Sequence, residues 1–457
     1  MNSFSVWDLM LDISIISGLL LLGTFLRAKV KIVQTLFLPA SMIAGFIGLG
    51  LGPSGLNILP FSNQIVSYPG LLIAVIFAAL PIGAEKIDAK KIMGRVRDMW
   101  SYSMLLTLLM WGGGAFVGLA ILNHIFGSLH PGFGLMLGAG FLGGHGTAAA
   151  LGEAFKRQGW EEALTLGMTS ATVGILVAIL GGLFIIKRST QKGHASFMSS
   201  FNNLPTELRT GLVPKKNRTS MGTEAISSSS IDPLVFHIAI ISLVVGLAFW
   251  ISQVAQDILA NIALPLFSIA FLIGLLLQFI LRKTKADQYV DHHIMGRIGG
   301  SATDYLVAFG IASINLSVVM DYAVPLTLLL VFGIFWAYFI FSVIGPNVFN
   351  QYWFEKALFG WGWSTGSVAM GLALLRIVDP ELKSKTMDDY ALAYIGMIPV
   401  EMVIITMAPL LYVNGLPWVF PIVLLLIGII IIFVYKSKGW WGNSKEFTTS
   451  RDSEIMK

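Results

Sequence analysis

The sequence contains 457 residues, of which 55% are apolar and only 12% are charged, and its formal net charge is +5. An ordinary soluble domain carries about 25% charged residues, so this composition excludes a water-exposed surface over most of the chain and indicates a lipid environment. The absence of cysteine excludes disulfides, thiolate nucleophiles and cysteine metal sites. The small basic excess lies in short loops between apolar runs, where it indicates membrane orientation and not nucleic-acid binding.

Membrane spans can be predicted in chain order, because a helix needs about 20 apolar residues to cross the hydrocarbon core. The N-terminus is acidic, with Asp8 and Asp12, and has no basic segment before the first apolar run, so we expect that run to stay as a span. Two further apolar segments, 131–155 and 354–375, are crowded with glycine and other small residues. The predicted spans are 7–26, 36–53, 68–84, 101–125, 161–186, 233–254, 263–281, 298–318, 322–344, 389–412 and 417–435.

The distribution of lysine and arginine predicts the orientation of these spans. With the N-terminus outside and the C-terminus cytoplasmic, all basic residues except Lys156 and Arg157 lie on the cytoplasmic side. This distribution requires the segments 131–155 and 354–375 each to enter and leave on the same side. We therefore predict two re-entrant hairpins, the first from outside and the second from inside. A full crossing by the first segment is the alternative, and it would place Lys156 and Arg157 inside.

An internal repeat is indicated by the similarity of residues 38–48 to residues 264–274, which share leucine, proline, alanine, glycine and two isoleucines. Each half has five spans and a hairpin between the fourth and the fifth, and because five is odd the second half must be inverted. The predicted fold is therefore an all-α integral membrane protein with two inverted-topology repeats and an extra C-terminal transmembrane helix. The predicted parts are repeat 1–186, a polar cytoplasmic linker 187–231, repeat 232–412, and the extra helix and tail 413–457.

The first hairpin is predicted to bind a substrate. Its glycines expose backbone groups that lipid cannot satisfy, and such groups bind cations through carbonyls and anions through N–H groups at a helix start. Close packing through small residues is the alternative interpretation. The predicted substrate-binding residues lie in this hairpin and in the span after it: Gly144, His145, Gly146, Thr147, Thr169, Ser170 and Thr172.

The second hairpin is predicted to bind an ion. Three hydroxyl residues, Ser364, Thr365 and Ser367, flank Gly366 and offer neutral oxygens to sodium, unless they bond to their own backbone instead. Glu401 lies within a span, where a carboxylate is costly, and it could bind a cation or carry a proton.

Other polar residues in or near spans have simpler interpretations. Asp304 could act like Glu401 or could complement a helix dipole near its helix start, and His237 is interpreted as interfacial. The sequence has no enzyme motif and no transition-metal cluster, so we expect neither catalysis nor a cofactor.

A family resemblance follows from these motifs. Residues Gly143 to Thr147, followed by Ala149 and residues 169–174, resemble the sodium/glutamate symporters of bacteria. The similarity includes Pro39 with Gly45, the loop 83–95, both hairpins and the linker. It implies sodium-driven uptake of glutamate across the bacterial inner membrane, with Na+ as the coupling ion. It also implies a homodimer in which one domain moves like an elevator against a fixed scaffold.

The second half departs from the family pattern. The family's second hairpin carries Ala-Thr-Pro-Thr where this chain has residues 364–367, and its following span carries Asp and Asn where this chain has Ile404 and Met407. Glu401, one helical turn earlier, can substitute for that carboxylate. We expect a secondary active symporter of L-glutamate or a related small amino acid or carboxylate, working by alternating access. The alternatives are a proton-coupled carrier of a different small carboxylate or amino acid, and a channel.

Overall fold

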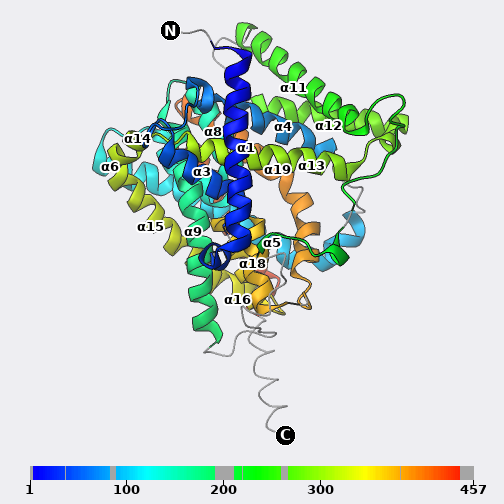
Figure 1. The fold of residues 1–457 in the computed structure, drawn as a ribbon. Helices are drawn as coiled ribbons and strands as arrows, with labels where there is room; N and C mark the ends of the chain where they lie inside the picture. Colours follow the sequence, from blue (N-terminus) through cyan, green and yellow to red (C-terminus); the bar gives the residue numbers. More distant parts are fainter. Residues whose placement is uncertain are drawn as a thin grey trace.

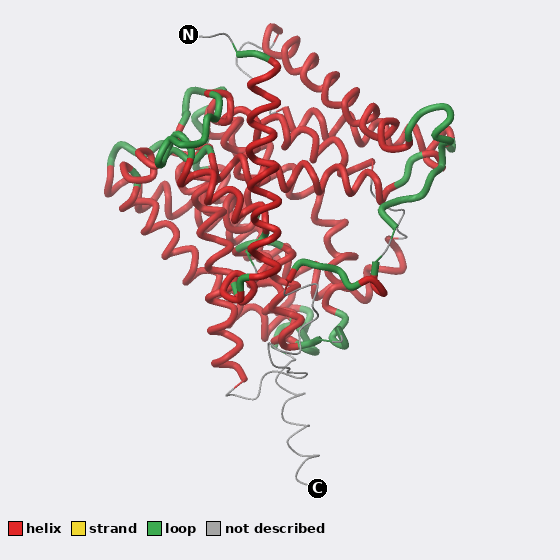
Figure 2. Tube along the Cα trace, in the orientation of Figure 1, coloured by secondary structure: helices red, strands yellow, loops and turns green. Residues whose placement is uncertain are grey.

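The computed structural model describes residues 4–36, 38–82, 89–190, 210–218, 220–258, 266–380 and 382–442. This part of the chain is helical and contains no strand (Figure 2). Nine of its helices are long and apolar enough to cross a membrane. The prediction of an all-helical, multi-pass membrane protein is confirmed.

The helices follow one another as two series separated by the linker (Figure 1). The first series is α1 (Val6–Lys29), α2 (Lys31–Thr35), α3 (Ala40–Leu51), η1 (Asn63–Ser67), α4 (Tyr68–Ile82), α5 (Ala89–Val117), η2 (Gly118–Leu122), α6 (Asn123–Phe126), η3 (Pro131–Gly134), α7 (Leu135–Leu137), η4 (Gly138–Leu142), α8 (Gly144–Lys156) and α9 (Glu162–Thr190). After η6 (Lys215–Asn217), the second series is α11 (Pro233–Ile258), α12 (Leu266–Thr284), η7 (Ala286–Tyr289), α13 (His292–Ala312), α14 (Leu316–Asp321), α15 (Ala323–Phe339), η8 (Ile340–Ile344), α16 (Gly345–Val348), α17 (Trp353–Thr365), α18 (Val368–Val378), α19 (Thr386–Val413) and α20 (Val419–Ser437).

Three predicted spans differ clearly from the observed helices, and one of them, 101–125, lies in a helical run that begins twelve residues earlier at Ala89. The other two are α3 and α13. The span expected at 36–53 is the 12-residue helix α3, which starts after Pro39 and ends before Gly52. Such a helix is about 18 Å long, too short to cross a hydrocarbon core of about 30 Å. The span expected at 298–318 is α13, which starts six residues earlier because Asp291 caps it by accepting a hydrogen bond from the Ile294 amide. It ends at Ala312, and the side chain of Asn315 caps the separate helix α14.

The buried apolar side chains form one large core and two smaller ones. The large core surrounds α5, α9, α15, α19, α20 and the segments 131–156 and 353–378. The smaller cores join α4, α11, α12 and α13, and join α1 and α3 to α13. Large apolar side chains on the outside of the helices are well exposed, such as Trp250, Phe279, Phe335 and Phe433. These exposed side chains are suited to contact with lipid.

The two halves pack reciprocally on each other. α3 crosses α13, where a methyl group on Gly48 would lie 2.8 Å from the Ala312 side chain. α12 crosses α4, where a methyl group on Gly274 would lie 2.7 Å from Pro81. Gly48 and Gly274 are the equivalent last positions of the repeated segments 38–48 and 264–274. Each half therefore places its second predicted span against the third span of the other half, through glycines that permit close approach.

The described end of the linker is anchored to the start of α13. Both the amide and the hydroxyl of Thr223 donate to the Asp291 carboxylate. Burial alone would raise the pKa of Asp291, but hydrogen bonds from Thr223 and from the Ile294 amide hold that pKa well below its usual range. His237 is buried and accepts the Asp291 amide at 2.8 Å, so it has a structural role at the start of α13, and its interpretation as an interfacial residue stays a prediction. These contacts fix at least residue 223 of the predicted flexible linker.

The extra C-terminal helix α20 packs along α5. The Tyr435 hydroxyl donates to the Asp98 carboxylate at 3.2 Å, and the Arg97 guanidinium lies 4.1 Å from the centre of the Trp440 ring. A methyl group on Gly112 would lie 3.0 Å from the Leu425 side chain. α20 is thus an integral part of the large core.

Candidate functional site at the hairpin tips

The segment 131–156 folds back on itself as a helical hairpin. One arm runs through η3, α7 and η4 (Pro131–Leu142), and the other is α8. At the base, the His130 ring stacks on Trp160 with 4.1 Å between ring centres, and a methyl group on Gly132 would lie 2.9 Å from Phe155. The chain reverses at Gly144, which has a φ of +64° in the left-handed region that favours glycine. The first hairpin therefore begins and ends at the same end of the molecule.

The segment 353–378 forms the second hairpin from α17 and α18. A methyl group on Gly362 would lie 2.7 Å from the α-carbon of Gly371, so glycines allow the two arms to touch. The ion pair between Lys356 Nζ and an Asp389 carboxylate oxygen, 3.0 Å apart, joins the first arm to the helix that follows the hairpin. Ser367 starts α18 as its cap and accepts the Met370 amide.

The two hairpins enter from opposite ends of α5. Asn350, just before α17, donates to Asp98 near one end of α5. Gly134, at the start of the first hairpin, lies against Gly118, where α5 has continued into η2. The helical rise between residues 98 and 118 is about 30 Å. Figure 1 shows the same arrangement, with α8 in the upper part of the molecule and α16 and α18 in the lower part.

The tips of the two hairpins meet beside the middle of α9. A methyl group on Gly144 would lie 3.5 Å from the Gly366 carbonyl oxygen, and one on Gly366 would lie 2.9 Å from the Ala178 side chain. The indole of Trp361 donates to the Ala178 carbonyl at 3.1 Å and holds the second hairpin on α9. The junction joins the ends of η4 and α17 to the starts of α8 and α18, where the last carbonyls and the first N–H groups have no partner within their own helix; at α18 the Met370 amide is bound by Ser367.

His145 and Thr172, two of the predicted substrate residues, are brought together. His145 Nε2 lies 3.1 Å from the Thr172 hydroxyl, and both side chains are buried. Because that hydroxyl donates to the Met168 carbonyl at 2.8 Å, it accepts the Nε2 proton of His145. A neutral His145 then has an unprotonated Nδ1 that can accept a hydrogen bond from a ligand.

Ser170 is fully buried, and its hydroxyl has no hydrogen-bond partner among the described residues. It lies against Gly140 in the π-helical turn η4, where a side chain would collide with the hydroxyl. A buried polar group without a partner costs about 1–3 kcal/mol, so the position is suited to a ligand. Thr169, by contrast, donates to the Thr165 carbonyl of its own helix.

The hydroxyls of the second tip bond to their own backbone. Ser364 and Thr365 both donate to the Trp361 carbonyl, at 3.2 Å and 2.7 Å. The alternative interpretation, in which these hydroxyls bond to their own backbone, describes this geometry. The two hydrogen bonds fix the orientation of both side chains. A hydroxyl that donates keeps its oxygen lone pairs, so these oxygens can still coordinate a cation.

Glu401 is held along its own helix. The Tyr394 hydroxyl donates to its carboxylate at 3.0 Å, and both residues belong to α19. In the described chain no hydrogen bond joins Glu401 to the second tip. Its predicted part in the ion site stays a prediction.

Asp304 is exposed and lies in the second half of α13. The helix-dipole interpretation is wrong, because that effect acts within the first turn. The sequence suggested that Asp304 lies near a helix start because the predicted span began at residue 298, whereas α13 begins at His292. Arg297, Ser301 and Asp304 follow one exposed face at helical spacing. In the loop 83–95 that contributes to the family resemblance, residues 83–88 lie outside the described residues and residues 89–95 form the start of α5.

Comparison with known proteins decides the family. The family profile described as "Sodium/glutamate symporter" matches residues 7–352. The chain belongs to the sodium/glutamate symporter family. A curated sodium/glutamate symporter from Haemophilus influenzae (strain ATCC 51907 / DSM 11121 / KW20 / Rd) is 26% identical over 203 residues, which are 41% of this chain and 46% of that relative. The alignment therefore spans about half of the relative's length.

A solved structure is also similar to this chain: the sodium proton antiporter MjNhaP1 from Methanocaldococcus jannaschii. The two share 18% sequence identity over 94% of this chain and 97% of that one, with a TM-score of 0.37.

The family is described as one of sodium/glutamate symporters, which are membrane transporters and not enzymes. The match to the family profile includes the whole first hairpin and ends at residue 352, directly before α17. The second hairpin, α19 and α20 lie beyond it, which agrees with the departures from the family pattern at residues 364–367, 404 and 407. Among the described residues no group of three or more His, Asp or Glu could hold a metal ion.

Proposed function

We propose that this protein is a secondary active transporter that couples Na+ to the uptake of L-glutamate or a related small amino acid or carboxylate. The observation that carries this proposal is the junction of the two hairpin tips beside α9. The helix starts at this junction favour a carboxylate, and the carbonyl ends favour a cation. Both ligands of a sodium-coupled symporter can therefore bind close together.

The substrate binds on the side of the first tip. The start of α8 supplies N–H groups at Gly144, His145 and Gly146, and His145 adds an acceptor for the substrate's ammonium group. Thr147, Thr169, Ser170 and Thr172 line the same region, and the unpartnered Ser170 hydroxyl is the strongest of these candidates.

The ion binds on the side of the second tip. Its ligands are oxygens of Ser364, Thr365, Gly366 and Ser367. Sodium coordinates hydroxyl and carbonyl oxygens, and the back-bonded geometry of Ser364 and Thr365 holds two of them in place.

Glu401 supports a second candidate, a proton-coupled carrier of a different small carboxylate or amino acid. A carboxylate inside a membrane helix, bonded to Tyr394, can take up and release a proton during transport. In that case Glu401 carries the coupling proton, and the second tip binds substrate.

The architecture we propose is a pair of inverted repeats with re-entrant hairpins. The entry of the hairpins from opposite ends of α5 and the reciprocal packing of α3 on α13 and α12 on α4 support it. Alternating access follows if the core around the hairpins moves like an elevator against the remaining helices. We propose a homodimer in the bacterial inner membrane, with the N-terminus outside and the C-terminus cytoplasmic.

Uptake of radiolabelled L-glutamate into proteoliposomes, with and without an inward sodium gradient, tests this proposal. Saturable uptake that requires the sodium gradient supports the symporter, and uptake that follows a proton gradient supports the second candidate. Leucine disfavours the positive φ that the first tip requires at residue 144, so Gly144→Leu should abolish uptake. Gly146→Leu, at the same tip, should abolish uptake as well. Normal uptake by Gly144→Leu would exclude the tip site, and uptake without any gradient dependence would indicate a channel.

A further inference from the structure

The middle of α5 carries two buried hydroxyls that do not belong to the candidate site at the hairpin tips. Ser103 is 1% exposed and Thr107 is fully buried, and neither hydroxyl has a hydrogen-bond partner in the part of the chain that the structure describes. A serine or threonine inside a helix can donate to the carbonyl four residues earlier, as Thr169 and Thr172 do in α9. Because Ser103 and Thr107 make no such bond, both oxygens are open to a ligand.

The two hydroxyls lie on the face of α5 that is turned towards the hairpins. Ser103 and Thr107 are four residues apart and therefore share one face of the helix. Gly114 lies seven residues after Thr107, on nearly the same face. A methyl group on Gly114 would lie 3.0 Å from the Leu137 side chain of the first hairpin. The hydroxyls of α5 therefore face the hairpins and not lipid.

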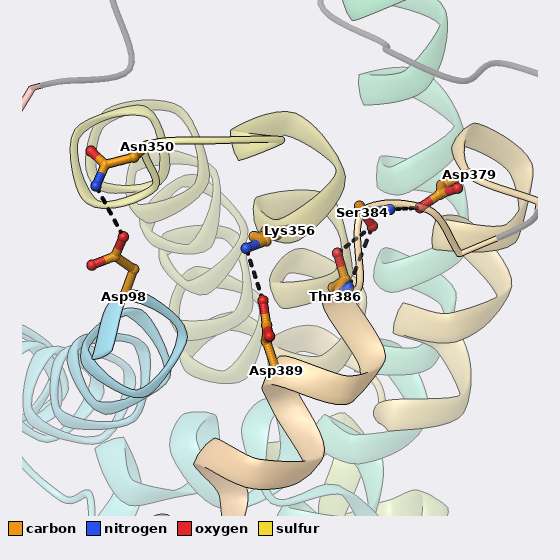
Figure 3. A network of polar contacts seen from close by, with 7 residues as sticks. All are labelled: Asp98, Asn350, Lys356, Asp379, Ser384, Thr386 and Asp389. Atoms are coloured by element: carbon orange, nitrogen blue, oxygen red, sulfur yellow. Dashed lines mark hydrogen bonds and ion pairs between the residues drawn. The ribbon is translucent and has the colours of Figure 1, made fainter. Parts of the chain in front are cut away.

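The second hairpin ends at the level of Thr107. Its base lies near one end of α5, where Asp98 accepts a hydrogen bond from the Asn350 side chain (Figure 3). Further along, a methyl group on Gly360 would lie 2.5 Å from the Tyr102 ring. α17 ends five residues later, a rise of about 7.5 Å, which is also the rise from Tyr102 to Thr107.

The first hairpin approaches the same level from the other end of α5. A methyl group on Gly138 would lie 2.7 Å from the Trp111 ring, and the chain reverses at Gly144, within about 9 Å by helical rise. On its other side, η4 packs on α9 through Gly140, which lies against the Ser170 hydroxyl. The hairpin tips therefore lie between α9 and the hydroxyl face of α5.

The parts of the hairpins that pack on α5 favour a cation. These parts are η4 and α17, and both end at the tips, where their last carbonyls have no partner within their own helix. Carbonyl ends of interrupted helices coordinate Na+ in transporters. α5 itself has no charged residue from Met99 to its end at Val117, so it offers only neutral oxygens to this region.

We propose that the hydroxyls of Ser103 and Thr107 are ligands of the coupling Na+ and that α5 forms the second wall of the tip site. This inference rests on the proposed function, which places the ion at the second tip. The lone pairs of the two hydroxyls face the cation together with the carbonyl ends of η4 and α17. The cation then satisfies two buried groups that have no partner in the described protein.

Thermal unfolding of the purified full-length protein in detergent tests the proposal without transport. Sodium chloride is compared with choline chloride at constant ionic strength, and Na+ should raise the unfolding midpoint of the wild type in a saturable way. The double variant Ser103→Ala with Thr107→Val should need at least about tenfold more Na+ for the same shift. In choline it should unfold no earlier than the wild type, because it removes hydroxyls that have no partner.

Two further variants separate a ligand from a structural residue. Thr406→Val is the matched control, because its hydroxyl bonds to Ser268 of α12 at 2.7 Å. It should unfold earlier than the wild type in choline and keep the wild-type Na+ response. Thr107→Ser retains the oxygen and should respond to Na+ like the wild type. In proteoliposomes the double variant should need at least about tenfold more Na+ for half-maximal uptake, with the glutamate KM at saturating Na+ close to that of the wild type.

The outcomes distinguish this inference from the proposed function. A Na+ response that is equal in the double variant and the wild type would overturn the role of α5 and leave the sodium symporter standing. A wild type that does not respond to Na+ and takes up substrate with protons would overturn both. An increased glutamate KM with unchanged Na+ dependence would assign the two hydroxyls to the substrate and would also overturn the proposal.

Discussion

The carbonyl oxygen of Thr365 lies against the α-carbon of Gly174, in the space that a side chain at residue 174 would fill. This contact places the second tip directly on the middle of α9. The neighbouring Gly366 also packs on α9, where a methyl group on it would lie 2.9 Å from the Ala178 side chain. The position of the second tip relative to the first therefore depends on a glycine in a third element.

Gly174→Ala should separate the second tip from α9 and disrupt the candidate site. The added methyl group would collide with a backbone carbonyl, which cannot rotate away as a side chain can. We expect destabilisation of about 1–3 kcal/mol and at least a tenfold loss of uptake. Gly246→Ala in α11 is the matched control, because nothing lies within 4 Å of the added methyl group. Equal uptake by the two variants would show that the contact is unimportant.

Thr172→Val should weaken substrate binding through His145. Valine keeps the shape of the side chain but removes the oxygen that accepts the Nε2 proton, and an unpaired buried donor costs about 1–3 kcal/mol. We expect an increased KM for uptake, with Thr172→Ser close to the wild type. Thr24→Val removes a hydroxyl that bonds only to its own helix and controls for the loss of such a bond. An unchanged KM in Thr172→Val would remove His145 and Thr172 from the binding site.

Charge and glycine content act locally along the chain, so the sequence could indicate where the segments 131–156 and 353–378 fold back on themselves; that they are re-entrant in a membrane stays a prediction. Basic loops show which segments must return to the same side, and glycine shows where backbone can be exposed. A binding site where the two hairpin tips meet was expected, but the particular contact of Gly144 with Gly366 joins residues more than two hundred positions apart and is not specified by residue types. The hydroxyl directions of Ser364 and Thr365 also depend on local carbonyl geometry that residue types do not specify.

The length of α3 and the position of α13 were mispredicted for a different reason. Hydropathy measures apolar content, whereas the helix ends are determined by Pro39 and Gly52 in α3 and by the capping residue Asp291 in α13. Both helices pack closely against the other half of the protein, α3 on α13, as α12 packs on α4.

The exposed polar face of α13 should be in contact with water. Arg297, Ser301 and Asp304 would be costly in hydrocarbon, so we expect them to line an aqueous space. The chain has no cysteine, so Ser301→Cys provides a single labelling site. A membrane-impermeant maleimide, added to both faces of the membrane, should label Ser301→Cys and leave Leu272→Cys on the outer face of α12 unlabelled. Protection of both cysteines would show that lipid or another protein surface covers this face.

Tyr435→Phe should loosen α20 from α5. It removes the hydrogen bond to Asp98 and leaves the ring packing, so the expected loss is about 0.5–1.5 kcal/mol of unfolding free energy. Thermal unfolding in detergent measures this loss. Tyr338→Phe is the control, because no hydrogen bond of its hydroxyl is present in the described structure. Unfolding midpoints that are equal in both variants would show that packing alone holds α20.

Asp291→Asn should destabilise the protein at neutral pH and should do so less in acid. The folded pKa of this carboxylate lies below its usual value of about 3.9, so its contribution is fully present above that pH and falls as the pH drops towards the folded pKa. Asparagine still caps α13 but accepts the Thr223 hydrogen bonds without a charge. We expect a deficit of about 1–3 kcal/mol at pH 7 that shrinks at pH 3, measured by thermal unfolding. Asp321→Asn, at an exposed position, should show no such deficit. A deficit of Asp291→Asn that stays constant from pH 7 to pH 3 would mean that the charge is unimportant and that only the shape of the residue matters.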